Sequence, residues 1–450
     1  MRRRIGFGAA LMTTALLFAF LNTGAFAAEL KPGGGDDTAA IQKAADAGGA
    51  LHFSGTYRIT KPITIDLAKA GFTSFLGDGT ARIIMAGSGP AFRFVGTHDG
   101  TASPDTVDDE VLAKERMPIV DGLEIIGENA EADGIEAMGT LQLTITRSRF
   151  SKLRHGVRLV KRNRNVIISH CHIYDNSGIG IFFDKVNLHQ TNITGCHISY
   201  CNGGGIVTRG GHVCNVHIAG CDLESNMSPD SPPTANVEID NRGGTTAEVA
   251  ITGCTIQHTH LAPDSANIRV IGPGKDYKAG TPEAKATEWG HITISANILS
   301  DVDTNIHLLH ARGVVITGNT FWEGFDQDVL VESCRNVVMT GNQFERNPGY
   351  ENGRTEFPNQ GIVFRDSVDC TLSALHITGV HHQPAALILE RCRRFHVSDC
   401  TILDCDNAGL LLRDVTQSRI HGNFIRDDRV GKPPFQPVII EGGEDNRIGE

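Results

Sequence analysis

Aromatic residues are scarce in this sequence, which has two tryptophans, five tyrosines and 20 phenylalanines among 450 residues. Positive charge is also in deficit, because 41 Lys and Arg face 52 Asp and Glu and leave a net charge of −11 at pH 7. Such a chain lacks the basic surface on which nonspecific nucleic-acid binding depends. After residue 27 no apolar run approaches the ~18 residues of a transmembrane helix. Neither nucleic acid nor a membrane is therefore an expected partner of the mature protein.

The N-terminus has the three parts of an export signal. Arg2, Arg3 and Arg4 are basic, Ile5–Leu21 is largely apolar, and Ala25-Phe26-Ala27 fits an A-x-A cleavage site. Its removal leaves 38 basic residues against 52 acidic ones, a net charge of 38 − 52 = −14. No cysteine follows the apolar stretch, so a lipid anchor is not expected. We expect a secreted or periplasmic protein.

A short repeat of alternating apolar residues fills the chain from its middle onward. Its sixth position is mostly Cys or Asn and recurs every 22–25 residues, with three longer intervals of 33, 43 and 33. A constant period of this length, built from short alternating segments and turns, is typical of a solenoid. The sixth positions are Ser148, Cys171, Cys196, Cys221, Cys254, Asn297, Asn319, Asn342, Leu375, Cys400 and Asn423.

Each repeat contains three short strand-like pieces, which predicts a parallel β-helix whose strands pair with the equivalent strand of the next rung at about 4.8 Å. The repeated Cys and Asn then stack as a ladder at one turn, where Cys is a small buried residue and Asn bonds along the stack. We therefore expect the 11 cysteines, an odd number, to be reduced and buried. In this register His172 and His197 stack on each other, which argues against a zinc site.

Residues 34–60, GGDDTAAIQKAADAGGALHFSGTYRIT, resemble the N-terminal signature of the pectate-lyase-like right-handed β-helix superfamily. The resemblance implies a capping helix over Ala39–Ala47, begun by Asp37 or Thr38, with Ile41 and Ala44 on its apolar face. It is specific for the fold and not for the activity, because the superfamily includes lyases, hydrolases, epimerases and phage tailspikes. The signature sets of polygalacturonases and alginate epimerases are absent.

The expected organisation is a signal peptide at 1–27, an N-terminal cap at 28–50 and one all-β parallel β-helix domain over 51–450. Loop insertions are expected near 97–118, 225–236, 258–290 and 345–360. The last three flank the strand that ends each repeat, and long loops on one side of a regular scaffold usually build a binding site.

Strand alternation places a set of charged side chains outward on that strand, between these loops. Glu238 and Asp240 are about 6.6 Å apart along one strand, near the carboxylate separation of inverting glycosidases. The candidate catalytic residues are Glu238, Asp240, Asp184, His307 and Arg269. The candidate substrate-binding residues are Arg209, Arg158, Lys185, Arg242 and His310.

Three functions fit this pattern. The first is hydrolysis of an anionic polysaccharide, with paired carboxylates as acid and base and arginines on the substrate's acid groups. The second is a polysaccharide lyase, in which Arg269 or His307 is the base and Asp184, Glu238 and Asp240 could hold Ca²⁺. The third is a non-catalytic sugar-binding or surface protein. The same charges can also be plain ion pairs on a solvated sheet, since Glu332, Arg365, Glu390, Arg413 and Glu441 continue the column.

Overall fold

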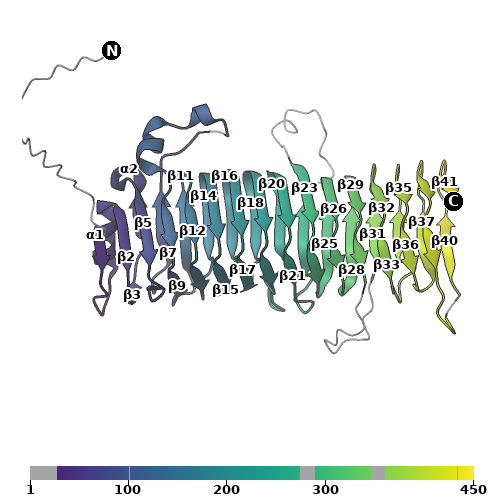
Figure 1. Cartoon of the computed structure of the whole chain (residues 1–450), viewed down its shortest axis with the longest axis horizontal. Coiled ribbons are helices and arrows are strands. Elements are labelled where there is room, and N and C mark those ends of the chain that lie inside the picture. Colours follow the sequence, from purple (N-terminus) through teal and green to yellow (C-terminus); the bar gives the residue numbers. More distant parts are fainter. Residues whose placement is uncertain (1–27, 101, 274–288, 346–359, 433, 450) are drawn as a thin grey trace, which may run out of the picture.

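The computed structural model describes residues 28–100, 102–273, 289–345, 360–432 and 434–449. The chain forms one long solenoid, and its strands stack in order from the N-terminal end to the C-terminal end (Figure 1). Every strand pairing is parallel, and each strand pairs with the equivalent strand of the preceding and following turns. The predicted signal peptide, residues 1–27, lies outside the described residues.

Each rung consists of three flat faces, which the chain visits in a fixed order and which we call face 1, face 2 and face 3. In the central rungs faces 1 and 2 are two halves of one bent strand: β14 (Val157–Ser169), β16 (Ile181–Thr194), β18 (Ile206–Ala219) and β20 (Ala235–Thr252). Face 3 forms a separate 14-stranded sheet. The three strands per repeat that the sequence predicts are thus confirmed.

Face 1 continues on both sides of these bent strands. Before them it contains β4 (Ile63–Asp66), β7 (Gly89–Val95) and β10 (Ala132–Met138). After them it contains β22 (Ala266–Ile271), β25 (Val302–Leu309), β28 (Gly324–Glu332), β31 (Ile362–Arg365), β34 (Leu387–Glu390), β37 (Ala408–Arg413) and β40 (Gln436–Glu441).

Face 2 continues in the same way. Before the bent strands it contains β1 (Ala28–Leu30), β2 (Gly49–Phe53), β5 (Thr73–Gly77), β8 (Ile119–Asp121) and β12 (Thr144–Thr146), and β11 (Thr140–Leu141) pairs at the bend of β14. After them it contains β23 (Gly290–Ser295), β26 (Arg312–Thr317), β29 (Arg335–Thr340), β32 (Thr371–Ser373), β35 (His396–Ser398), β38 (Arg419–His421) and β41 (Arg447–Gly449).

Face 3 is built from short strands throughout. They are β3 (Thr56–Ile59), β6 (Arg82–Met85), β9 (Glu124–Gly127), β13 (Arg149–Ser151), β15 (His172–Asn176), β17 (His197–Cys201), β19 (Asp222–Glu224), β21 (Thr255–Gln257), β24 (Ile298–Ser300), β27 (Thr320–Phe321), β30 (Gln343–Phe344), β33 (His376–Thr378), β36 (Thr401–Leu403) and β39 (Phe424–Arg426).

The corners between faces are made by residues in the left-handed region. The corner between faces 1 and 2 uses Lys185 (φ 48°) on one rung, and Gly210 (φ 65°) with Gly211 (φ 72°) on the next. Left-handed residues turn the chain sharply, and strand pairing continues on either side of them. Repeated on every rung, this device keeps three flat faces in register.

The core is a column of apolar side chains that point inward from all three faces. Ile181, Ile206, Val237 and Ile268 stack on face 1, and each is at most 1% exposed. Phe321 and Phe344 stack from face 3 with ring centroids 4.6 Å apart. This column confirms the inward register that the sequence alternation predicts.

The Cys/Asn ladder lies at the corner between faces 2 and 3, as expected. Asn297 donates to Asn319 Oδ1 at 3.0 Å, and Asn319 donates to Asn342 Oδ1 at 3.0 Å. Cys221 and Cys254 continue the same stack as buried thiols. The eleven cysteines form no disulfide and ten of them are buried, whereas Cys214 is partly exposed.

The N-terminal end of the solenoid is closed by α1 (Thr38–Ala47), which buries Ile41 and Ala45 against the first rungs. Ala44 also packs against the core from the same helix, as expected, although it is less deeply buried than Ala45. Asp37 stands at the N-cap, but its carboxylate accepts from the backbone N–H of Gly33 and Arg58. Asp36 caps the helix instead, since its Oδ1 accepts from Thr38 N at 3.0 Å.

Short helices also decorate the first turns. A single helical turn, α2 (Leu67–Ala70), precedes β5, and the segment between β7 and β8 carries η1 (Pro104–Thr106) and η2 (Val111–Glu115). No helix in the described part of the chain is both long and apolar enough to cross a bilayer.

Candidate functional site

Face 1 lies between excursions of the chain on both of its long edges. Residues 225–234 and 258–265 enter it from face 3, before β20 and β22. Residues 97–118 and 272–289 leave it toward face 2, and of the latter the stretch 274–288 lies outside the described residues, as does most of the expected loop at 345–360. The central rungs of face 1 are therefore the place where a long ligand would meet loops on two sides.

The predicted site residues form two neighbouring rows on face 1. Parallel register places Val207 beside Glu238, Glu238 beside Arg269, and Arg269 beside His307. The second row lies two residues further along each strand. It contains Asp184, Arg209 and Asp240 on consecutive rungs. The register that the sequence alternation predicts thus brings these side chains together.

Arginine side chains pair with the carboxylates of this cluster. Arg209 donates from Nε and Nη2 to Glu238 Oε1 at 3.1 and 2.7 Å. Arg242 holds both oxygens of Asp240, at 2.9 and 2.7 Å, and its own backbone N–H adds a third bond. The guanidinium of Arg158 bridges Asp184 and Glu136, with 3.1 Å to the latter.

Burial of this cluster differs from the sequence expectation. Glu238, Asp240 and Arg269 were expected on a solvent face, but their exposed fractions are 4%, 8% and 4%. The excursions contribute to the burial of Arg269, which donates from Nη1 to Thr234 O and from Nη2 to Asp264 O, and also pairs with Asp264 Oδ1 at 3.0 Å. Its guanidinium therefore ties both loops to face 1.

His307, at the next rung, has an imidazole that is 14% exposed. Its Nε2 lies 3.2 Å from Glu332 Oε2, and its Nδ1 has no hydrogen-bond partner among the described residues. Burial, reinforced by the neighbouring Arg269 charge, lowers the pKa of His307. The ring is therefore neutral near pH 7, which is the form that can accept a proton.

The remaining substrate-binding candidates lie at the rim of face 1. Lys185 and His310 both occupy the left-handed corner position that leads to face 2, and Lys185 is exposed. The Arg209 and Arg242 side chains are 43% and 64% exposed, so their outer edges face solvent while they hold buried carboxylates.

The later rungs repeat the charge alternation of the second row. Glu332, Arg365, Glu390, Arg413 and Glu441 follow one another in register. They are joined by a continuous chain of ion pairs, such as Arg365 with Glu390 at 3.3 Å and Arg413 with Glu441 at 2.8 Å. This column is a ladder of cross-strand ion pairs, as expected for a solvated sheet.

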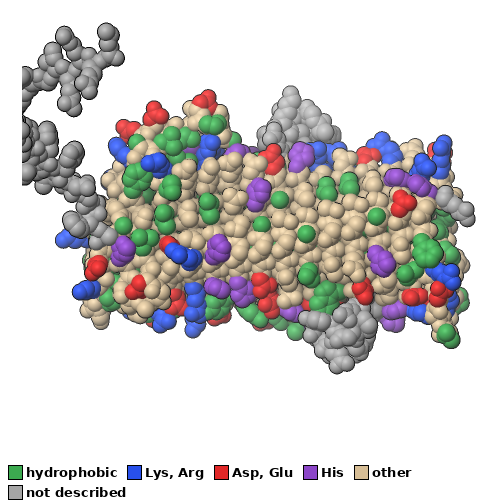
Figure 2. Space-filling view, viewed as in Figure 1, with side chains coloured by type: hydrophobic (Ala, Val, Ile, Leu, Met, Phe, Trp, Pro, Cys, Tyr) green, Lys and Arg blue, Asp and Glu red, His purple; other side chains and the backbone are tan. Residues whose placement is uncertain are grey.

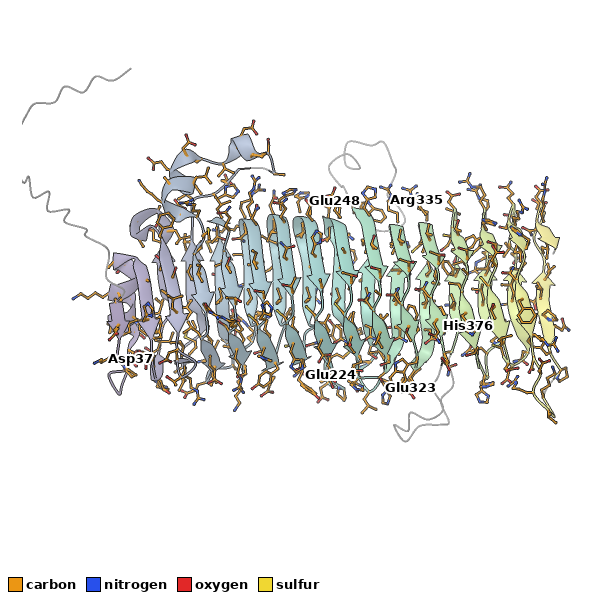
Figure 3. The ribbon with its side chains drawn as sticks, viewed as in Figure 1. Asp37, Glu224, Glu248, Glu323, Arg335 and His376 are labelled. Atoms are coloured by element: carbon orange, nitrogen blue, oxygen red, sulfur yellow. The ribbon has the colours of Figure 1, made fainter. Side chains whose placement is uncertain are left out.

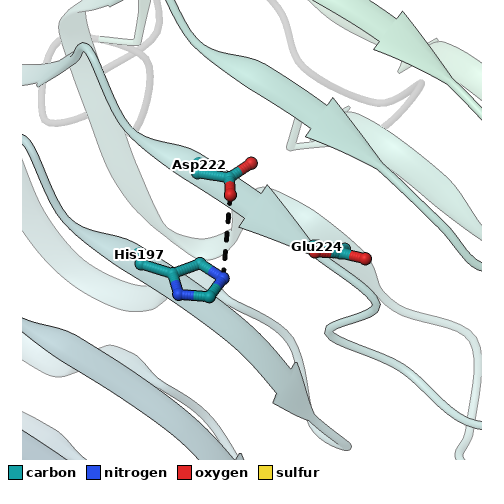
Figure 4. A group of neighbouring side chains, drawn as sticks. All are labelled: His197, Asp222 and Glu224. Atoms are coloured by element: carbon teal, nitrogen blue, oxygen red, sulfur yellow. Dashed lines mark ion pairs between the residues drawn. The ribbon is translucent and has the colours of Figure 1, made fainter.

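A second cluster lies on face 3 and was not among the predicted site residues. His197, Asp222 and Glu224 each offer a ligand atom, and these atoms lie within 4.8 Å of one another (Figure 4). His258, which follows β21, adds an imidazole whose Nε2 is 3.8 Å from Glu224 Oε1 and whose Nδ1 is 3.8 Å from Asp301 Oδ2. Glu224 and Glu323 project along the same long edge of the solenoid (Figure 3).

This second cluster is the better candidate for a divalent cation. An ion placed between three atoms that are within 4.8 Å of one another lies at most about 2.8 Å from each, close to the 2.0–2.6 Å of protein metal bonds. Asp222 and Glu224 pair with histidines, not with arginine or lysine, among the described residues. By contrast, the predicted calcium ligands Asp184, Glu238 and Asp240 are each held by an arginine.

The signal for the second cluster was present in the sequence but ambiguous. Asp222 and Glu224 alternate outward around Leu223, and the 25-residue spacing from His197 to Asp222 places them on neighbouring rungs. Exposed Asp and Glu on a sheet are usually only solvated, and the approach of His258 depends on the path of a loop. Charged groups gather along the edges of the solenoid rather than across its broad visible face (Figure 2).

Comparison with known proteins supports the architecture. The model of the right-handed β-helix region family matches residues 112–256, and the model of the periplasmic copper-binding protein (NosD) family matches residues 236–431. No curated protein sequence matches the chain.

Several solved structures have the same fold at low identity. The pre-mature gene product 12 of bacteriophage phi29 is 14% identical with a TM-score of 0.60, over 89% of this chain and 56% of that one. The tailspike of Escherichia coli bacteriophage HK620, solved with a hexasaccharide, is 13% identical with a TM-score of 0.56, over 92% and 76%. The Dettilon tailspike is 14% identical with a TM-score of 0.51, over 91% and 66%.

Copper, named in the second family's description, does not fit the matched segment. The described residues of 236–431 bring no three metal-ligating side chains within reach of one ion. The cysteines of that segment, Cys254, Cys334, Cys370, Cys392, Cys400 and Cys405, are all buried in the wall of the solenoid. The parallel three-faced rungs, the capping helix and the family match together show that the chain folds as a right-handed parallel β-helix.

Proposed function

We propose that this protein is an exported enzyme that cleaves glycosidic bonds in an anionic polysaccharide by hydrolysis, with Glu238 and Asp240 as the reacting carboxylates. The observation that carries the proposal is their position. The two lie on one strand of face 1, β20, at the rung where the excursions 225–234 and 258–265 fold over the sheet. One carboxylate would protonate the leaving oxygen and the other would activate water.

The arginines explain the preference for an anionic substrate. Arg209 and Arg242 hold Glu238 and Asp240 from the solvent side, and both guanidiniums remain partly exposed. A sulfate or uronate group of the substrate would compete for the same donors, because guanidinium binds such groups in two-point fashion. Binding of the substrate would then release the carboxylates from their ion pairs at the moment they are needed.

The hexasaccharide reported with the HK620 tailspike shows that this fold can present a surface to a long sugar chain in that protein. A polysaccharide along face 1 of the present chain would run across successive rungs, meeting Arg158, Arg209 and Arg242 in turn. The export signal at 1–27 is consistent with a secreted or periplasmic location, where such polymers occur.

A polysaccharide lyase is the second candidate, and His307 favours it. A neutral, largely buried imidazole next to Arg269 is suited to remove the proton α to a uronate carboxylate, while a cation stabilises the resulting charge. The hydrogen bond between His307 Nε2 and Glu332 Oε2 would orient the imidazole ring for this task. A non-catalytic sugar-binding protein is the third possibility.

A panel of acidic polysaccharides tests the proposal, assayed for new reducing ends and for the ultraviolet absorbance of an unsaturated product. A hydrolase raises the first signal alone, a lyase raises both, and a binding protein raises neither while retaining affinity. We expect reducing ends alone. Glu238→Gln and Asp240→Asn should each lower kcat by about 10²-fold or more.

Glu390→Gln and Glu441→Gln are the matched controls, since they lie in the same charge column away from the excursions. They should leave kcat within about twofold. Equal insensitivity to all four substitutions would refute the assignment of Glu238 and Asp240. An unsaturated product that is lost in His307→Gln would replace hydrolysis by elimination.

A further inference from the structure

Two arginines are buried at the corner between faces 1 and 2, on β14. Arg162 and Arg164 point outward on either side of the inward Asn163, and their exposed fractions are 9% and 8%. They are covered by the excursion 97–118, because Arg164 donates from Nη1 to Ser103 O at 3.1 Å and from Nη2 to Ala102 O at 2.8 Å. A segment some 60 residues earlier in the chain thus closes over two positive charges.

Arg162 forms no ion pair with any described residue. Its buried Nε and Nη2 atoms have no hydrogen-bond acceptor among the described residues. Burial lowers the pKa of Arg162; the Asp99 carboxylate opposes this shift, and the adjacent Arg164 charge reinforces it. Burying a guanidinium without an acceptor is strongly destabilising, so its retention calls for an anion that completes the site.

Two imidazoles lie beside these arginines and also have unused ring nitrogens. His189 is the register partner of Arg164 on the next rung, and its buried Nδ1 has no partner in the described part of the chain. On the other side His98 donates its backbone N–H to Gly139 O, and Gly139 donates to Arg162 O. The buried His98 Nε2 likewise has no partner among the described residues. The pKa of His98 is lowered by burial first and then by both arginine charges.

The nearby carboxylates do not neutralise this cluster. Asp99 is exposed and forms no ion pair with Arg162 or Arg164 among the described residues. Glu115 is buried, but its two oxygens are bonded to Thr97 N and Oγ1 at 2.7 and 2.6 Å. Glu248, near His189, accepts from Asn215 at 2.6 Å.

We propose that Arg162, Arg164, His98 and His189 form a binding site for a compact oxyanion, namely sulfate, phosphate or the carboxylate of an acidic sugar. The free Nε–H and Nη2–H of Arg162 are the parallel pair of donors that binds such groups at two points. Each imidazole adds one donor in the tautomer that places its hydrogen on the unused nitrogen. The site is separate from the carboxylate cluster of face 1 and does not rest on the function proposed above.

Calorimetric titration of the mature full-length protein with sodium sulfate, sodium phosphate and sodium glucuronate tests this site, with sodium chloride at matched ionic strength as the reference. We expect one saturable site per chain for at least one of these anions and none for chloride. Binding of sulfate or phosphate alone identifies an inorganic or ester-type group, and binding of glucuronate identifies a sugar carboxylate. No binding of any of the three would overturn the proposal.

Arg162→Met should weaken this binding roughly ten- to hundredfold, because it removes charge-assisted hydrogen bonds. In chloride alone the variant should melt at the same temperature as the wild type or higher, since the buried unpaired charge is gone. Arg391→Gln, an exposed ion-pair arginine, is the control and should bind as the wild type does. If Arg162→Met does not fold, His189→Gln replaces it, with a smaller expected loss of affinity. Anion affinity that is unchanged in these variants would refute the assignment of the residues.

Discussion

At the scale of single residues, the clearest departure from an ordinary environment is Asp328 on β28. It terminates an internal row of buried asparagines, Asn226, Asn236, Asn267 and Asn305, each of which donates to the next. Its Oδ1 accepts from Asn305 and from Gly324 N, while its buried Oδ2 has no partner. Burial raises the pKa of Asp328 to about 7.

This environment predicts a pH-dependent stability. The native state keeps the Asp328 proton up to about pH 7, whereas the unfolded chain loses it near the ordinary value of 3.8. Stability is therefore fully present below about pH 4 and falls by at most about 1.4 kcal/mol per pH unit until about pH 7. Asp328→Asn, which extends the amide row, should remove this loss.

Urea unfolding of wild type and Asp328→Asn at pH 5 and pH 8 measures the effect. The variant should gain stability relative to the wild type as the pH rises between these values. A constant difference between the two proteins across this range would show that Asp328 is already ionised in the native state.

At the scale of elements, the corner between faces 2 and 3 accepts either a thiol or an amide side chain. In the ladder between faces 2 and 3, Cys254 occupies the position that Asn297 occupies one rung later, and Cys254 N donates to Asn297 Oδ1 at 2.9 Å. The Asn side chains use this position to donate along the stack and to a backbone carbonyl, as Asn297 does to Asn319 and Ile251.

Cys254→Asn should therefore be tolerated within about 1 kcal/mol, because the new amide can donate to Asn297 Oδ1 and to Ile218 O, the carbonyl that the thiol now faces. Cys254→Leu should cost about 1–3 kcal/mol by overpacking the corner. Denaturant unfolding of both variants tests the pair. A cost of Asn equal to that of Leu would mean that the corner excludes an amide at this rung.

Arg269 shows how a loop is attached to a regular face. Its guanidinium joins the carbonyl oxygens of Thr234 and Asp264, which belong to different excursions, and it also pairs with the Asp264 carboxylate. A role in holding loops is thereby added to the role of base that the sequence suggested.

Arg269→Gln should loosen both excursions and lower the free energy of unfolding by about 1–3 kcal/mol. Limited proteolysis should then cut within 225–234 or 258–265 faster than in the wild type. Arg413→Gln, which removes a partly exposed arginine of the later ion-pair column, is the control and should change stability by about 0.5 kcal/mol or less. Unchanged cleavage rates in Arg269→Gln would show that other contacts hold the loops.

At the scale of the whole molecule, stability comes from one continuous apolar column with no cross-links. Each rung contacts only its neighbours, as in other solenoids, and α1 covers the column at its N-terminal end. The free thiols are part of that column, and burial raises the pKa of Cys201 to about 12. The reactivity of these thiols therefore shows whether the fold is intact.

A thiol reagent at pH 8 should label one cysteine in the native protein, Cys214, whose side chain is the partly exposed one. After denaturation without reductant it should label all eleven. Rapid labelling of several native thiols would indicate that the rungs open locally, and four or fewer thiols in the denatured protein would indicate disulfides.

The sequence by itself determined the solenoid and its register. Two-residue alternation separates inward from outward side chains, and the 22–25-residue period assigns each strand its neighbour, so that Glu238, Arg269 and His307 could be placed on adjacent rungs. Both signals are local and recur in every repeat, so the register of each rung agrees with that of the rung before it. The buried thiols and the Cys/Asn ladder follow from the same register.

Only the tertiary structure decided which segments of the chain cover the outward-facing side chains. The excursions have no period, so their paths over face 1 cannot be deduced from strand register. The burial of Arg269, the approach of His258 to Glu224 and the contact of Arg164 with residues 97–118 all depend on those paths. Charge pairing is decided at this level as well, because Arg209 pairs with Glu238 although its register partners are Asp184 and Asp240.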